Sequence, residues 1–144
     1  MRAALLVLLA GCAQLIEPDV GPPAHAACSD VDSDPDHDVS YARDVGSLID
    51  EYHCRDCHTP GGKTPIGVEV GGLDLSSYET MRVGGTRSGA AIIVPAMPCS
   101  SALLQKVSAG PPFGARMPLN GPTYLEPEDL QLISDWIAEG AHDN

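Results

Sequence analysis

The sequence is poor in aromatic side chains and in positive charge. Its 144 residues include one Trp and one Phe, and aromatic residues make up 4% of the chain. With 15 Gly and 13 Pro, few bulky side chains remain to build a core, so we expect a disulfide or a cofactor to supply part of it. The 8 Lys and Arg stand against 20 Asp and Glu, a formal net charge of −12. This balance argues against nucleic acid as a partner, because phosphate contacts need basic side chains.

The apolar run at the N-terminus is too short to span a bilayer. It reads MRAALLVLLAGC over residues 1–12, with one positive charge at its start and the sequence LAGC at its end. This pattern is typical of a bacterial secretory signal with a lipobox. We therefore predict a signal peptide over residues 1–11 and acylation of Cys12, the alternative being an ordinary start of a buried helix.

Acylation at Cys12 would anchor the protein to a membrane without a transmembrane helix. Ala13 and Gln14 follow Cys12 where an Asp would favour the inner membrane, so we expect the periplasmic face of the outer membrane. Export also permits disulfides.

Residues 12–39 are rich in proline and end in the acidic stretch DVDSDPDHD. We predict a solvated tether here and a folded domain over residues 40–144. A calcium-binding loop fits poorly, because the frame that starts at Asp30 has Pro35 where glycine is required and Tyr41 where glutamate is required.

Apolar side chains recur at helical spacing in four segments, which are residues 40–54, 76–85, 99–107 and 126–140. Ser40 is a plausible N-cap of the first segment, and Ser76 with Glu79 has the spacing of a capping box in the second. Pro127 near the first turn and Gly140 at the end bound the last segment. Residues 73–76 and 90–94 could form short strands, but no βαβ alternation is visible. The sequence therefore predicts an all-α fold.

The segment Cys54-Arg55-Asp56-Cys57-His58 concentrates two thiols and an imidazole. A thioredoxin-like dithiol would begin a helix in a βαβ unit, whereas here a helical pattern runs into the motif from its N-terminal side. A structural zinc site would need a fourth ligand, usually from a second paired motif, and none follows. The third reading is covalent attachment of haem c, for which C-x-x-C-H is the signature.

The spacing of this motif has a physical reason. Thiols three residues apart, at Cys54 and Cys57, can form thioethers to two vinyl groups on one edge of a porphyrin. The imidazole of His58 can then ligate the iron. We predict one covalent haem c.

A methionine sulfur is the usual partner of histidine in electron-carrying cytochromes c. Met81 lies inside a short amphipathic helix and is expected to pack in the core. Met97 and Met117 both precede a proline in irregular chain, and Met117 is the preferred candidate. Arg116 is the cation closest to Met117 in sequence, and we expect it to interact with a haem propionate or with solvent.

The chain resembles class I c-type cytochrome domains of bacterial exported lipoproteins, including the planctomycete type. The matching features over roughly residues 40–141 are a helix leading into CRDCHTPGG, then GGLDLSSYETM, SALLQKV, GARMPLNGP and LQLISDWIAEGA. The resemblance implies thioethers at Cys54 and Cys57 and axial ligation by His58 and Met117. It also implies that the first and last helices cross near the haem edge. Gly46 would permit their close approach there, and Trp136 would pack at the crossing.

The remaining cysteines are Cys28 and Cys99. An even remainder in an exported chain predicts a disulfide between them, with two free thiols or a bond to a partner as the alternatives.

These features predict a membrane-tethered electron carrier rather than an enzyme, with redox proteins as partners and no small-molecule substrate. A peroxidase-like or gas-sensing haem domain, a cytochrome subunit of a larger oxidoreductase, and a structural lipoprotein without haem are the alternatives.

Overall fold

A computed structural model describes residues 28–119, 121 and 123–144 of the protein. The predicted signal peptide and the lipidation site at Cys12 lie outside the described residues and stay predictions. The described residues form helices and connecting loops without a β-strand, which confirms the all-α prediction. None of the helices described is long and apolar enough to cross a membrane.

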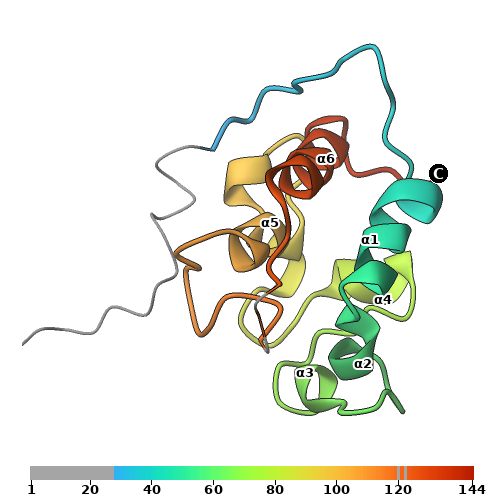
Figure 1. The fold of residues 1–144 in the computed structure, drawn as a ribbon, viewed down its shortest axis with the longest axis vertical. Coiled ribbons are helices and arrows are strands. Elements are labelled where there is room, and N and C mark those ends of the chain that lie inside the picture. Colours follow the sequence, from blue (N-terminus) through green and yellow to red (C-terminus); the bar gives the residue numbers. More distant parts are fainter. Residues whose placement is uncertain (1–27, 120, 122) are drawn as a thin grey trace, which may run out of the picture.

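Short helices dominate the described part of the chain, and α6 is the longest of them. In chain order the elements are the π-turn η2 (Tyr41–Val45), α1 (Gly46–Glu51), α2 (Cys54–His58), α3 (Ile66–Glu69), α4 (Tyr78–Val83), the 3₁₀ turns η3 (Gly89–Ile92) and η4 (Pro98–Ser100), α5 (Ala102–Val107) and α6 (Pro127–Ala138). Helix α5 lies beside α6, while α2 and α3 sit together at the far end of α1 (Figure 1).

The ends of the first and last helical segments follow the predicted signals. Ser40 caps η2, because its Oγ accepts a hydrogen bond from the backbone N–H of Arg43 at 3.2 Å. Pro127 is the first residue of α6, and Gly140 adopts a φ of 109° just beyond the helix end. Both residues therefore have the roles that the sequence predicts.

The capping box of α4 lies one residue later than predicted. The Oγ of Ser77 accepts from the N–H of Thr80 at 3.2 Å, and the Oγ1 of Thr80 accepts from the N–H of Ser77 at 3.1 Å. The prediction of Ser76 and Glu79 as the pair is wrong, because the Ser76 hydroxyl donates to the carboxylate of Asp74 instead.

The two possible strands do not form. Residues 73–76 connect α3 to α4 as a loop, and residues 89–92 form η3. With no neighbouring strand, the backbone of the second segment bonds locally, as where the N–H of Ala91 donates to the carbonyl of Ser88 at 3.1 Å. Burial of Ile92 and Ile93 explains its apolar character.

Trp136 on α6 is fully buried at the centre of an aromatic cluster. Its ring lies 5.6 Å from that of Tyr41 and 6.4 Å from that of Tyr78. Its Nε1–H donates to the carbonyl of His142 at 2.9 Å, so the polar end of the ring is satisfied. The packing of Trp136 against the first helical segment agrees with the resemblance.

The role predicted for Gly46 is not the one observed. A Cβ atom at Gly46 would lie 3.1 Å from the carbonyl oxygen of Tyr41, which belongs to the π-turn just before it. In the first helical segment, the contact with α6 is made mainly by η2, not by the part of α1 that begins at Gly46. The missing side chain therefore accommodates the π-turn itself.

Residues 28–39 form an arm that crosses above α6 before entering η2 (Figure 1). The hydroxyl of Ser33 donates to the buried carboxylate of Asp135, and the N–H of Val39 donates to Glu139 at 2.8 Å. This end of the predicted tether is held against the helices, while the domain boundary at residue 39 stays a prediction.

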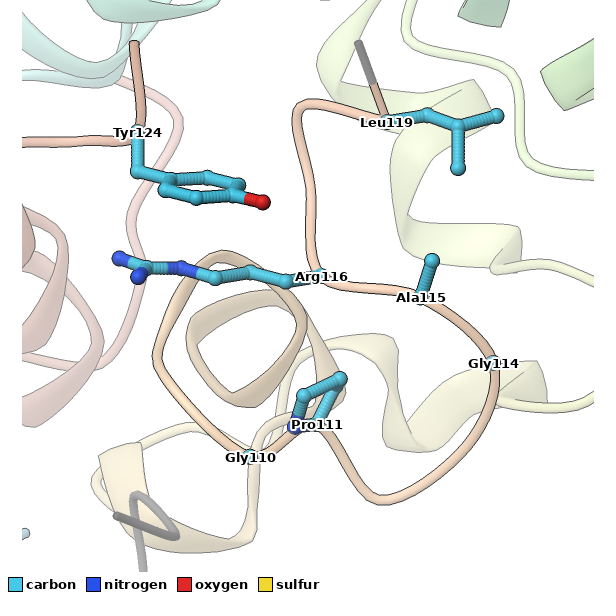
Figure 2. A pocket seen from close by; sticks show the side chains of 7 residues that line it. All are labelled: Gly110, Pro111, Gly114, Ala115, Arg116, Leu119 and Tyr124. Atoms are coloured by element: carbon cyan, nitrogen blue, oxygen red, sulfur yellow. The ribbon is translucent and has the colours of Figure 1, made fainter. Parts of the chain in front are cut away.

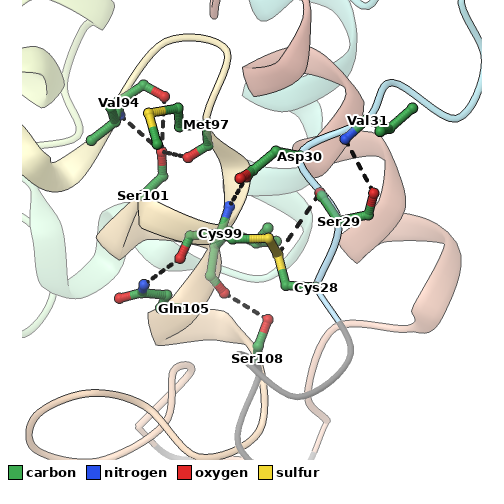
Figure 3. The surroundings of a disulfide bond; sticks show 11 residues. Cys28, Ser29, Asp30, Val31, Val94, Met97, Cys99, Ser101, Gln105 and Ser108 are labelled. Carbon is green, nitrogen blue, oxygen red and sulfur yellow. Dashed lines mark hydrogen bonds between the residues drawn. A yellow bond between two sulfur atoms is a disulfide. The ribbon is translucent and has the colours of Figure 1, made fainter.

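A disulfide fixes the start of the arm. Cys28 and Cys99 are bonded, with their Cα atoms 5.5 Å apart and a sequence separation of 71 (Figure 3). Next to the bond, the carboxylate of Asp30 accepts from the N–H of Cys99 at 2.8 Å. The amide of Gln105 donates to the carbonyl of Cys99 at 2.6 Å, so both the N–H and the carbonyl of Cys99 are hydrogen-bonded.

Candidate functional site

Helix α2 is a single helical turn, separated from α1 by Tyr52 and His53, of which His53 has a left-handed conformation. His53 has φ 53° and ψ 29°, which is uncommon for a residue other than glycine. The continuous helix expected to run into the motif is therefore broken at His53. Within α2, Cys54 and Cys57 are three residues apart, which brings their side chains to neighbouring positions on the helix surface.

Both cysteines are free thiols and are half-buried. Cys54 packs against the hydrophobic core. Burial raises the pKa of Cys54 to about 11, so at neutral pH it is a protonated thiol.

The imidazole of His58 is oriented from one side. Its Nδ1 atom lies 3.2 Å from the carbonyl oxygen of Leu73, and the N–H of Leu75 donates to the His58 carbonyl at 2.6 Å. Burial lowers the pKa of His58, the bond to Leu73 opposes this, and the charge of Lys106 lowers the pKa further. A neutral ring that donates through Nδ1 has its free lone pair on Nε2, the atom that can then ligate a metal.

Arg55, inside the motif, holds α2 to the loop at residues 73–75. Its Nε–H donates to the carbonyl of Leu75 at 3.0 Å, and its guanidinium pairs with Asp50. The loop therefore positions both ends of α2. The sequence indicated a possible strand over residues 73–76, and only the structure shows that this segment contacts α2.

Gly67 in α3 lies directly against the imidazole. A Cβ atom there would be 2.5 Å from Nδ1 of His58 and 2.7 Å from the carbonyl oxygen of Cys57. Sequence reasoning found neither α3 nor this contact. The one available signal is an isolated glycine between Ile66 and Val68, a pattern that can mark a close approach.

The three candidate methionines have different surroundings. Met81 is fully buried in the core, as predicted, and Met97 is 44% exposed. Met117 is half-buried and packs against the core from the loop after α5. Its role as the sixth ligand stays a prediction.

An open pocket of about 310 Å³ lies beside the Met117 loop. Figure 2 shows its lining, which consists of Gly110, Pro111, Gly114, Ala115, Arg116, Leu119 and Tyr124. The guanidinium of Arg116 lies over the Tyr124 ring, with Cζ 4.1 Å from the centroid, and its Nε–H donates to the carbonyl of Val107 at 2.9 Å. Contacts within the chain therefore already engage Arg116.

The donor set fits a covalently attached haem. Two free thiols share one helical turn, and the next residue is a histidine whose Nδ1 is already engaged. Among the described residues, no three His, Cys, Asp or Glu side chains form a group that could hold a metal ion, as a zinc site would require.

Comparison with known families gives one match. The family described as Planctomycete cytochrome C matches residues 54–118, which begin at the first cysteine of the motif and include Met117. No curated protein and no solved structure matches the chain. Over residues 54–118 the match supports a c-type cytochrome-like domain, which agrees with the chemistry that the geometry of α2 indicates.

Proposed function

We propose that the protein is a mono-haem electron carrier. Cys54 and Cys57 bind haem c through thioethers, and His58 and Met117 are the axial ligands. The observation that carries the proposal is the geometry of α2, where two free thiols share one turn and Leu73 orients the adjacent imidazole. When bound, the haem supplies a one-electron couple.

The residues around the motif set the properties of this couple. The carbonyl of Leu73 accepts from Nδ1 of His58 and so raises the basicity of the ligand nitrogen. Met117, as the second ligand, would raise the reduction potential. A histidine–methionine pair leaves no open position on the iron, which favours electron transfer over catalysis.

The peroxidase-like or gas-sensing alternative needs an open sixth position with polar groups around it. Arg116, the nearest cation in sequence to Met117, is stacked on Tyr124 and bonded to the carbonyl of Val107. This supports the carrier, and the site offers no observation in favour of the alternative.

Anchoring and location complete the proposal. Acylation at Cys12 would hold the domain at the periplasmic face of the outer membrane. Since the arm is bonded from Cys28 onward, the tether between anchor and domain would run from residue 12 to residue 27. Tethering raises the effective concentration of redox partner proteins. The net charge of −12 favours basic or neutral surfaces on those partners.

A pyridine haemochrome spectrum and haem staining of a denaturing gel test the covalent haem. Colourless protein from a host with a working cytochrome c maturation system would overturn the proposal.

Met117→Ala tests the axial pair. The variant should keep its haem, lower the midpoint potential and bind carbon monoxide in the reduced state. Met97→Ala is the matched control, because Met97 is exposed and also precedes a proline. If Met117→Ala instead has the same midpoint potential and the same carbon monoxide binding as Met97→Ala and the wild type, Met117 is not the ligand.

A further inference from the structure

Lys106, near the end of α5, makes three hydrogen bonds to the loop that carries Met117. The Nζ of Lys106 donates to the carbonyl of Phe113 at 2.7 Å and to the carbonyl of Ala115. The carbonyl of Lys106 accepts from the N–H of Met117 at 2.8 Å. Lys106 therefore contacts three positions of residues 113–117, which we call the methionine loop.

The surroundings of the ammonium group indicate what it does. Lys106 takes part in none of the ion pairs found among the described residues. Its Nζ lies 4.9 Å from the centroid of the Phe113 ring, and the guanidinium of Arg87 lies 5.9 Å from the same centroid. A lysine ammonium has three donors and no acceptor. Here its partners are backbone carbonyls and an aromatic face, all of them in the methionine loop.

A second contact secures the same loop from the next residue of α5. The carbonyl of Val107 accepts from Nε of Arg116, and the guanidinium of Arg116 stacks on Tyr124 (Figure 2). Val107 itself is buried, so the helix end that carries both contacts is fixed in the core. The loop lacks regular structure of its own and takes its conformation from these bonds.

We infer that Lys106 is the positioning residue of the methionine loop, holding Met117 in the place from which its sulfur ligates the iron. This rests on the proposed function and deepens it. Lys106 does not touch the iron in this account, and it acts through the backbone of residues 113–117. Freeing the loop would weaken methionine ligation without changing covalent attachment at the cysteines.

The test compares Lys106→Gln with Lys106→Arg in the full, matured chain. Lys63→Gln is the matched control, because Lys63 is the other lysine of the sequence and its exposed ammonium bonds to Asp56 at 2.8 Å. The control removes the same charge without touching the loop. Four quantities are measured: haem content, the near-infrared charge-transfer band of sulfur-ligated ferric iron, carbon monoxide binding, and amide hydrogen exchange in residues 113–117.

Lys106→Gln should keep one haem per chain. It should weaken the charge-transfer band, bind carbon monoxide several-fold faster and exchange the loop amides at least tenfold faster than the wild type. Lys106→Arg should restore most of each property, because a guanidinium can also donate to two carbonyls.

Two results would overturn the inference. One is a Lys106→Gln variant equal to Lys63→Gln in band, ligand binding and exchange. The other, which decides the matter if the glutamine variant does not fold, is a Lys106→Arg variant that keeps its haem but loses the band. Absence of haem from the wild type would instead overturn the proposed function, and loop exchange would then still decide whether Lys106 holds the loop.

Discussion

The imidazole of His58 lies so close to the backbone of Gly67 that a Cβ atom at residue 67 would sit 2.5 Å from Nδ1 and 2.6 Å from Cε1. Real Cβ atoms do not approach other atoms so closely, so a side chain here must displace the ring or α3. We expect Gly67→Ala to lower the free energy of unfolding of the haem-free protein by about 1–3 kcal/mol, the range for overpacking. Chemical denaturation measures this change.

The same substitution should lower the yield of haem-bearing protein, since the displaced imidazole loses its bond to Leu73. Glu69→Ala is the control, because Glu69 is exposed on the same short helix. Equal stability of the two variants would contradict the close contact.

The thiol of Cys54 should react slowly in the haem-free protein. Only the thiolate is nucleophilic, and burial raises the pKa of Cys54 to about 11. At pH 8 roughly one molecule in a thousand then carries the thiolate. Alkylation should therefore accelerate about tenfold per pH unit until the pH approaches the pKa. Rates measured by mass spectrometry between pH 7 and 11 check the profile.

Assigning these rates requires that Cys54 be the one free thiol. A variant with Cys12→Ser and Cys57→Ser meets this condition, because Cys28 and Cys99 are bonded to each other. The unfolded variant in denaturant is the reference. If the pH at the midpoint of the alkylation profile is the same in the folded protein as in that reference, Cys54 is not buried.

The sequence predicts those features whose signals are local. A capping serine at Ser40, a proline at the start of α6 and a glycine beyond its end act within a few residues, and the structure has all three as expected. Pairing of Cys28 with Cys99 followed from counting cysteines. The distance of 71 residues did not obscure it, because few partners were left.

Other features depend on contacts that the sequence does not encode locally. The break at His53 requires a residue in the left-handed conformation, which histidine adopts more often than most residues but still rarely, so the sequence gives only a weak signal for it. Leu73 and Gly67 contact His58 only because the chain folds back after the motif. Ser77 replaces Ser76 in the capping box because Asp74 competes for a hydroxyl, a choice between adjacent serines that spacing alone does not resolve.

Removal of the disulfide should destabilise the protein substantially. Closing a loop of 71 residues restricts the unfolded chain, an effect worth about 4 kcal/mol in the chain-entropy estimate. We expect the double variant Cys28→Ser, Cys99→Ser to lose up to about this amount in chemical denaturation. A reductant should destabilise the wild type and leave the double variant unchanged. Equal stability of the oxidised wild type and the double variant would argue against the bond.

Besides the disulfide, hydrogen bonds of Ser33 should hold the arm against α6. Its N–H donates to Oδ1 of Asp135 at 3.0 Å, and its hydroxyl lies 3.0 and 2.8 Å from the two carboxylate oxygens. Ser33→Ala removes the hydroxyl and leaves a buried carboxylate with only the Ser33 N–H and Gln131 as partners. We expect the free energy of unfolding to fall by about 1–2 kcal/mol. This is a little below the usual contribution of a hydrogen bond to a charged acceptor, because Ser33 is exposed.

Ser29→Ala is the matched control for this change, since the Ser29 hydroxyl accepts only a local bond from the N–H of Val31. Hydrogen exchange locates the effect. In Ser33→Ala the amides of residues 31–39 should exchange faster, while those of α5 stay as in the wild type because the disulfide still holds the start of the arm. If both serine variants match the wild type in stability and exchange, the arm is not held by Asp135.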